Sequence, residues 1–276
     1  MNDYAYSREK SAPAGSNLYY SSLFYNDNKK EQLFGFFAFA ATLSEIIDQC
    51  SDPGVARIKL QWWHEEVERI FDQEARHPIG KDLAKINNDN ALDKTLLHRL
   101  IAFEEQKLHG FNVRTPDELL EHLLHGPGLL WYICVKCFGH IHPVTPESAR
   151  ETGSLLAFFN ILQNSRRDIS YGRLYLPQDE LESAGISQRH LLDKDSDNTR
   201  EFFYKQILFL IDQLNKNFRK FPAEDRPGHS HVRIMNRLQH GLCKAVISDD
   251  CNLLTRKISL TPLHKLWIAW RTNIKN

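Results

Sequence analysis

The stretch from Leu155 to Asp168 constrains the fold more than any other part of the chain. Its sequence, LLAFFNILQNSRRD, is apolar around most of a helical circumference, so we expect a helix that is buried nearly all round. Asn160, Asn164 and Asp168 follow at i, i+4 and i+8 and share one face of that helix. Unpaired polar groups are costly to bury. This face therefore meets a cavity, a metal, a partner or a polar network with another core helix, and the sequence leaves these alternatives open.

Most of the remaining chain has helical rather than strand periodicity. A chain of 276 residues can hold one large helical domain or two small ones. Short connections favour one all-α domain, a helical bundle around a central cavity, over residues 16–276. Residues 1–15 are polar and contain Pro and Gly, which predicts a flexible N-terminal arm. Helices are expected at 17–24, 29–49, 53–71, 93–109, 116–126, 129–138, 146–168, 195–221, 232–247 and 262–273, with short ones after 78, at 179–183 and at 187–192.

The helical periodicity also predicts which side chains face the core. In the helix that begins at Pro53, we expect Ile58, Trp62 and Ile70 to point toward the core. Its acidic residues are expected to point outward; they are Glu65, Glu66 and Glu68. The last helix places four apolar side chains on one face, as core or interface: Leu263, Leu266, Trp267 and Trp270. No basic amphipathic helix stands out in the sequence.

Composition excludes several classes of protein. The 35 basic and 35 acidic residues give a formal charge of zero, without the broad positive charge of a nucleic-acid binder. No apolar run reaches the roughly 18 residues of a membrane-spanning helix, and the N-terminus lacks the apolar core of a signal peptide. Five scattered cysteines are typical of reduced thiols, so a cytoplasmic protein is expected. Cys134 and Cys137 have zinc-type spacing, but no second pair accompanies them.

Two further motifs extend the buried helix into a recognisable signature. Asn160-Ile161-Leu162 precedes Asp168, and Gly172-Arg173-Leu174-Tyr175-Leu176-Pro177 follows it. This arrangement resembles the second signature of the squalene/phytoene synthase family. The resemblance implies an isoprenoid-synthase-like fold and head-to-head condensation of two prenyl diphosphates. In that family two aspartate-rich motifs hold Mg²⁺, which neutralises the diphosphate leaving group.

The resemblance also assigns residues to roles. An aromatic segment at Phe37 to Phe39 leads into the first motif, which ends at Asp48. The implied metal ligands are Glu45, Asp48, Asn164 and Asp168. The implied catalytic residues are Asp48, Asp168 and Tyr175. The implied substrate-binding residues are Tyr20, Ser21, Asn160, Asn164 and Arg173.

Both motifs depart from the family pattern. Ser44 and Asn164 stand where the proximal aspartates belong, so each motif keeps one of its two principal carboxylates. Arg167 stands where these enzymes often carry an acid. Neutral oxygens ligate Mg²⁺ without adding negative charge. The departures therefore predict a magnesium site that is weakened or lost.

A second branch of the same family accommodates these departures. The segment Leu60 to Trp63, the Gly-Arg turn and the closing Trp270-Arg271 resemble the phytoene-synthase-like assembly factors of respiratory complex I and their bacterial relatives. Two hypotheses follow. In one, the protein binds prenyl diphosphates and condenses them at a reduced metal site. In the other, it is catalytically inactive and acts as an assembly or binding factor, with an isoprenoid lipid or a protein partner at the periphery of the inner membrane.

Overall fold

The computed structural model describes residues 3–50, 52–90, 92–192 and 196–275, and these residues form helices and connections without any strand. The all-α prediction is therefore confirmed. Side-chain caps mark many helix starts: Asn26, Asp93, Thr115 and Thr261 each accept a hydrogen bond from a backbone N–H of the first turn. In chain order the helices are α1 (Asp3–Ser11), α2 (Asn17–Ser22), α3 (Asp27–Gln49), α4 (Pro53–Phe71), α5 (Pro78–Asn90), α6 (Lys94–Lys107), α7 (Pro116–Leu124), α8 (Pro127–Phe138), α9 (Val144–Ser170), α10 (Gln178–Ser183), α11 (Gln188–Leu192), α12 (Asp197–Lys220), α13 (Ser230–Ser248) and α14 (Pro262–Ile274).

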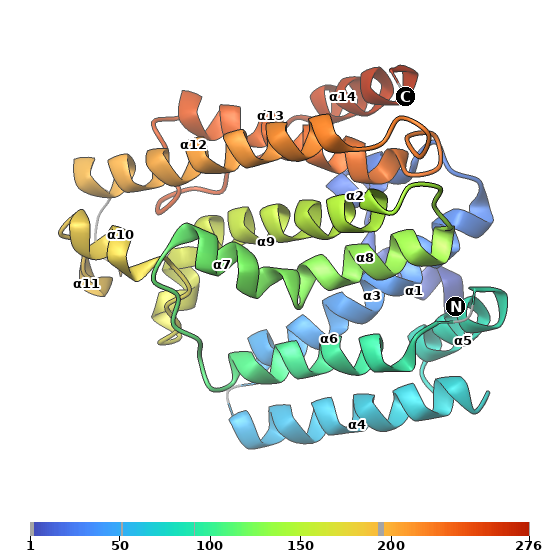
Figure 1. The fold of residues 1–276 in the computed structure, drawn as a ribbon. Helices are drawn as coiled ribbons and strands as arrows, with labels where there is room; N and C mark the ends of the chain where they lie inside the picture. The colour runs from blue at the N-terminus through green and yellow to red at the C-terminus, as the bar shows by residue number, and fades with distance from the viewer. Residues whose placement is uncertain (1–2, 51, 91, 193–195, 276) are drawn as a thin grey trace.

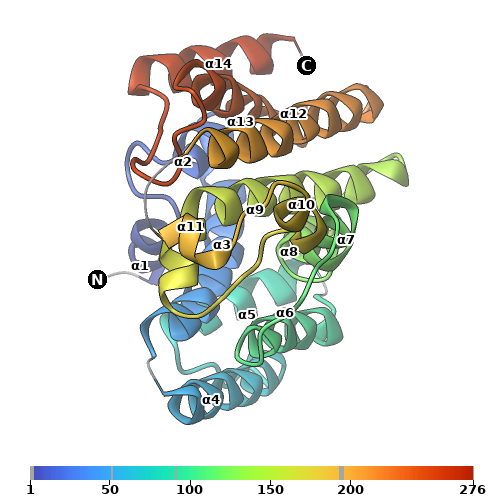
Figure 2. The same ribbon diagram turned by 90° about the vertical axis from the view of Figure 1, so that its left-hand side faces the viewer.

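The helices are stacked in layers. Figures 1 and 2 show α14 at one end of the stack, followed by α12 and α13, then α7, α8 and α9, and finally α4 at the opposite end. Helix α9 lies at the centre and contacts α7, α8, α11, α12 and α13. None of the helices in the described ranges has both the length and the hydropathy that crossing a membrane would require.

Two large apolar clusters form the core on either side of the central layer. One joins α7, α9, α12 and α13, and the other joins α3, α4, α5, α6 and α8. Helices α8 and α9 approach closely because of glycine at the contact: a Cβ on Gly153 would lie 2.3 Å from Cδ1 of Trp131 and 2.9 Å from the carbonyl oxygen of Pro127. The candidate cavity lies where these elements meet.

Helix α4 corrects the predicted burial pattern. Ile70 is buried as expected, whereas Ile58 is 72% exposed and Trp62 is 38% exposed. Glu66, predicted to point outward, is fully buried. Its carboxylate accepts hydrogen bonds from the backbone N–H groups of Arg76 and His77, both at 2.7 Å, just before α5 begins. The buried face thus contains a carboxylate that accepts hydrogen bonds from the backbone just before the next helix. A prediction based only on the spacing of apolar residues therefore places Glu66 at the surface.

The N-terminal segment also differs from the expectation. Residues 1–15 were predicted to be a flexible arm, yet Asp3–Ser11 forms helix α1, which packs against α3 and α5. Ser7 is fully buried and donates a hydrogen bond to Oδ2 of Asp82 at 2.6 Å, and Lys10 pairs with Glu45. The polar residues that suggest a loose arm here form specific contacts with the bundle.

Candidate functional site

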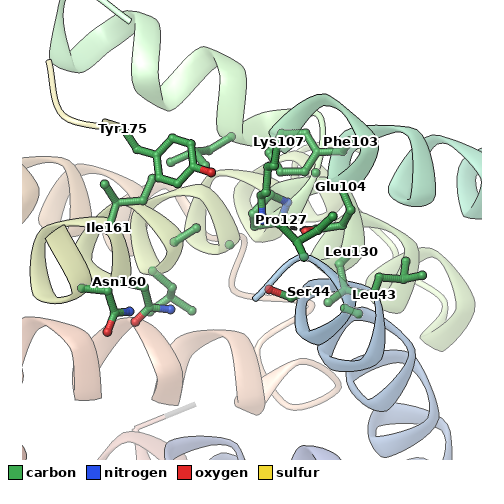
Figure 3. A pocket seen from close by; sticks show the side chains of 18 of the residues that line it. Leu43, Ser44, Phe103, Glu104, Lys107, Pro127, Leu130, Asn160, Ile161 and Tyr175 are labelled. Atoms are coloured by element: carbon green, nitrogen blue, oxygen red, sulfur yellow. Dashed lines mark hydrogen bonds and ion pairs between the residues drawn. The ribbon is translucent and has the colours of Figure 1, made fainter. Parts of the chain in front are cut away.

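A cavity of about 360 Å³ lies between the two core clusters, within the usual size range of small-molecule sites. Helices α3, α6, α8 and α9 supply most of its wall (Figure 3). The wall is mainly apolar; its larger apolar side chains include Leu43, Ile47, Leu100, Phe103, Phe111, Leu130, Trp131, Leu156 and Ile161. A wall of this composition favours an apolar ligand.

The polar row of α9 faces this cavity. Asn160, Asn164 and Asp168 all belong to its lining, as does Ser44 on α3 across from them. Asp168 is buried, whereas Asn160 is exposed to the cavity and Asn164 is half-buried. Of the alternatives that the sequence left open, the structure places this row at a cavity rather than in a network between core helices.

One guanidinium links the two retained carboxylates. Nη2 of Arg167 lies 3.3 Å from Oδ2 of Asp48 and also 3.3 Å from Oδ1 of Asp168. Asp48 comes from the end of α3 and Asp168 from the end of α9, so Arg167 connects the two motifs across the mouth of the cavity. Arg167 is half exposed, and the contribution of these pairs to stability is accordingly small.

A second guanidinium approaches Asp48 from the turn after α9. Gly172 adopts a φ of +74°, a conformation that strongly favours glycine, and reverses the chain there. Arg173 then places Nη1 3.6 Å from Oδ1 of Asp48 and donates from Nη2 to the carbonyl oxygen of Ile47 at 2.9 Å. Asp48 therefore contacts two cations, one in the last turn of α9 and one in the turn that follows this helix.

Burial and charge act against each other at Asp168. Desolvation raises the pKa of its carboxyl, and the nearby Arg167 guanidinium lowers it; the net pKa lies above the ordinary value. Because burial is the larger cause, a neutral group at this position would be easier to accommodate than the carboxylate.

Tyr175 supplies a polar atom that has no hydrogen-bond partner in the described part of the chain. The residue is 8% exposed, and its ring stacks on Phe111 with the ring centres 4.5 Å apart. Burial raises the pKa of its hydroxyl to about 12, and at neutral pH the protonated hydroxyl can donate a hydrogen bond. Figure 3 shows the hydroxyl directed into the cavity. An unpaired buried donor in such a place is suited to an acceptor on a ligand.

Sequence reasoning missed an ion pair in the wall. Nζ of Lys107 lies 2.8 Å and 2.9 Å from the two carboxylate oxygens of Glu104, and both side chains line the cavity (Figure 3). A signal for them exists in the sequence: Glu104 follows the buried Leu97 and Leu100 at helical spacing, with Lys107 one turn later. An acidic and a basic residue on the otherwise apolar face of a helix indicate an ion pair in the wall of a cavity.

Three predicted site residues lie outside the cavity lining. Glu45 pairs with Lys10 of α1, as described above. Ser21 is buried and donates to the carbonyl oxygen of Leu18 at 2.9 Å. Tyr20 packs against the apolar cluster around α9 and α13. The structure thus brings together Asp48, Asn160, Asn164, Asp168, Arg173 and Tyr175, and it does not bring in these three.

The donor set does not fit a magnesium ion. Mg²⁺ requires near-octahedral oxygen ligands, usually with one or two carboxylates and substrate phosphates. Here a cation of the protein contacts both Asp48 and Asp168, and the other oxygens facing them from α9 belong to neutral carboxamides. Within the described ranges, no group of three or more His, Cys, Asp or Glu side chains has an arrangement that could hold a metal.

The cysteine pair with zinc-type spacing lies apart from this site. Cys134 is fully buried in α8, and burial raises its pKa well above the ordinary value. Burial likewise raises the pKa of Cys137 to about 12. The thiolate is the form that binds metals and reacts. Cys134 belongs to the apolar cluster that includes α3 and α8, and Cys137 packs against that cluster as a partly buried side chain.

Comparison with known proteins identifies relatives along most of the chain. Residues 12–264 match the family described as "Squalene/phytoene synthase". A phytoene synthase of Mycobacterium tuberculosis is 23% identical over 260 residues, which cover 93% of this chain and 85% of that protein. The protein named NADH dehydrogenase (ubiquinone) complex I, assembly factor 6, of Mus musculus is 24% identical over 239 residues, 85% of this chain and 72% of that protein.

Solved structures share the fold. The squalene synthase HpnC from Alicyclobacillus acidocaldarius superposes with a TM-score of 0.73 at 19% identity, covering 91% of this chain and 95% of that one. A dehydrosqualene synthase in complex with ligand superposes with a TM-score of 0.83 at 13% identity, covering 99% and 96%. The helical architecture is therefore common to these proteins.

Proposed function

The chain belongs to the squalene/phytoene synthase family, and we propose that it is a non-catalytic member that binds an isoprenoid lipid in its cavity and acts as a binding or assembly factor. The observation that carries this proposal is the position of Arg167, whose guanidinium contacts both retained motif carboxylates. A family resemblance alone is compatible with either activity or its loss.

Charge at the cavity mouth supports the loss of condensation chemistry. Ionising an allylic diphosphate requires strong neutralisation of the leaving group, which metal ions supply. Two carboxylates, Asp48 and Asp168, stand beside two guanidinium groups, Arg167 and Arg173. The formal charges cancel, so this end of the cavity has no excess negative charge with which to concentrate several Mg²⁺ ions.

The cavity wall supports the ligand class. Its apolar side chains suit a prenyl chain, and the hydroxyl of Tyr175 is a donor without a partner among the described residues. An isoprenoid with a hydroxyl or carbonyl head group would place an acceptor there. Arg167, Arg173 and Lys107 already contact acidic side chains, which makes them weaker attractors for a diphosphate.

The assembly role is supported by similarity to complex I assembly factor 6, which matches over most of its own length. In this proposal the cavity is a binding site and the partner contacts lie elsewhere on the surface.

A second candidate is a prenyltransferase with a reduced metal site. It is favoured by the placement of Asn160, Asp168 and Tyr175 around one cavity and by the similarity to phytoene synthases. In this alternative, substrate binding would displace Arg167 from the two carboxylates and open the position between them.

Release of inorganic diphosphate distinguishes the two candidates. Purified protein would be mixed with Mg²⁺ and either farnesyl or geranylgeranyl diphosphate, beside Asp168→Ala and Ser44→Asp/Asn164→Asp proteins. We expect no release above the protein-free control from the native chain. Turnover by the native protein that disappears in Asp168→Ala would establish the prenyltransferase instead.

Ligand binding is tested separately with farnesol and its diphosphate. Calorimetry should give tighter binding of farnesol, and Tyr175→Phe should weaken it about fivefold through loss of one hydrogen bond worth about 1 kcal/mol. The Phe variant keeps the ring stacked on Phe111, so packing is matched. Tighter binding of the diphosphate, or affinity unchanged in Tyr175→Phe, would contradict the proposed ligand.

A further inference from the structure

Helix α14 presents an apolar strip to solvent. It lies at the outer end of the stack in both views of Figures 1 and 2. Ile268, Ala269 and Thr272 are buried in the bundle, and α13 is the main neighbour. The opposite face carries five apolar side chains that are between 45% and 80% exposed: Leu263, Leu266, Trp267, Trp270 and Ile274. Single exposed apolar residues are ordinary, but a strip at i, i+3, i+4, i+7 and i+11 is a contiguous surface.

A groove of about 670 Å³ runs beside this strip, between α13, α14 and Phe218 of α12. Five of its lining residues are basic: Arg233, Arg237, Lys244, Arg271 and Lys275. Among the described residues that line it, none is acidic. Three of these cations lie over aromatic rings. The guanidinium carbons of Arg237 and Arg233 lie 3.4 Å and 4.5 Å from the ring centre of Phe218, and that of Arg271 lies 4.9 Å from the ring centre of Trp267.

The groove has a surplus of positive charge. In the ranges that the structure describes, no ion pair joins Arg237, Lys244 or Arg271 to an acidic side chain. Burial lowers the pKa of Arg233 to about 10, with the neighbouring Arg226 and Arg237 as further causes, so this residue keeps its charge at neutral pH. Like charges gathered in this way favour an anionic counterpart.

We propose that α14 and this groove dock on an anionic lipid bilayer. The strip enters the boundary between head groups and acyl chains, and the groove cations contact lipid phosphates. Exposed tryptophans flanked by Arg and Lys are the pattern of helices that lie in the membrane interface. A 13-residue helix is about 20 Å long, which suits a helix lying flat on a bilayer rather than spanning it. This inference does not depend on which ligand occupies the central cavity.

The test is flotation of the full chain with vesicles of phosphatidylcholine alone and of phosphatidylcholine mixed with phosphatidylglycerol. We expect binding to the anionic vesicles only, weakened by added salt. Arg237→Gln and Lys244→Gln should each weaken binding about fivefold. Trp267→Ser/Trp270→Ser should weaken it about tenfold or more, since much apolar surface no longer enters the bilayer.

Matched substitutions away from the groove control for general effects. Lys205→Gln removes an exposed charge on α12, and Ile141→Ala trims an apolar side chain that is 76% exposed; both proteins should bind as the native chain does. Equal binding to neutral and anionic vesicles would overturn the proposal, and so would unchanged binding in the tryptophan and groove variants. A dimer in sedimentation velocity that dissociates in Trp267→Ser/Trp270→Ser would also overturn it, because a second copy would then cover the strip. If a variant fails to fold, the dependence of the native protein's vesicle binding on salt and on anionic lipid still tests the proposal.

Discussion

Arg167 and Asp168 are adjacent in the chain and bring opposite charges to the same end of the cavity. Asp168 keeps a carboxylate of the family motif, while Arg167 supplies a cation to it and to Asp48. A guanidinium in contact with a carboxylate neutralises its negative charge, so the carboxylate attracts a metal ion less strongly. The local charge pattern, rather than the loss of any single aspartate, therefore separates this chain from a metal-dependent enzyme in our account.

Helical spacing predicted part of this site and could not predict the rest. The shared face of Asn160, Asn164 and Asp168 follows from positions four residues apart, and the structure keeps it. The contact between Arg167 and Asp48 joins residues 119 positions apart, so it depends on how α3 and α9 pack. The implied roles of Tyr20, Ser21 and Glu45 rested on resemblance alone, and those side chains lie outside the cavity lining.

Asp168→Asn tests the balance of burial and charge. Burial raises the pKa of Asp168 in the folded state, so the folded protein binds this proton more tightly than the unfolded chain does. The ionised carboxyl therefore costs stability once the pH rises through the folded-state pKa. We expect the variant to melt at a higher temperature than the native protein near neutral pH, with a difference that narrows toward acid. Calorimetric melting across that range measures it, and a less stable variant at neutral pH would show that the Arg167 ion pair outweighs burial.

At the scale of the elements, α4 shows where periodicity misleads. The bounds predicted for this helix match those observed. Its buried face, however, includes Glu66, and Ile58 is exposed to solvent. The carboxylate satisfies backbone N–H groups that would otherwise be buried without partners at the entrance to α5. A rule that places every acidic residue at the surface cannot predict that Glu66 is buried, because its hydrogen-bond partners lie 10 and 11 residues further along the chain.

Glu66→Ala should be strongly destabilising. The substitution removes three hydrogen bonds at 2.7 Å, from the N–H groups of Arg76 and His77 and from Nε of Arg69, and leaves the backbone donors unpaired. We expect a loss of about 3 to 5 kcal/mol in urea unfolding. Glu65→Ala, on the exposed side of the same helix, should change stability by less than about 0.5 kcal/mol. Equal losses of unfolding free energy in the two variants would contradict the buried, hydrogen-bonded position of Glu66.

Across the whole chain, helix and loop patterning predicted the all-α class and the positions of the helices, whereas the isoprenoid-synthase-like fold was implied by the family resemblance. Proline and capping residues mark most helix starts, so the predicted and observed bounds agree closely from α2 onward. The polar N-terminal segment was the exception, because its side chains pair with α3 and α5 rather than with water. The exposed strip on α14 was visible as a face in the sequence, but only the packed bundle shows that this face is left uncovered.

A crystal structure of the protein grown with Mn²⁺ and a farnesyl thiodiphosphate analogue would show whether a metal ion enters between Asp48 and Asp168. Manganese scatters anomalously and takes the same oxygen ligands as magnesium. We predict no anomalous peak between Asp48 and Asp168, with the Arg167 guanidinium still contacting both. An Arg167→Gln/Ser44→Asp/Asn164→Asp protein treated alike is the positive control, and it should bind the metal. A manganese peak coordinated by Asp48 and Asp168 in the native protein, with Arg167 displaced, would contradict the account.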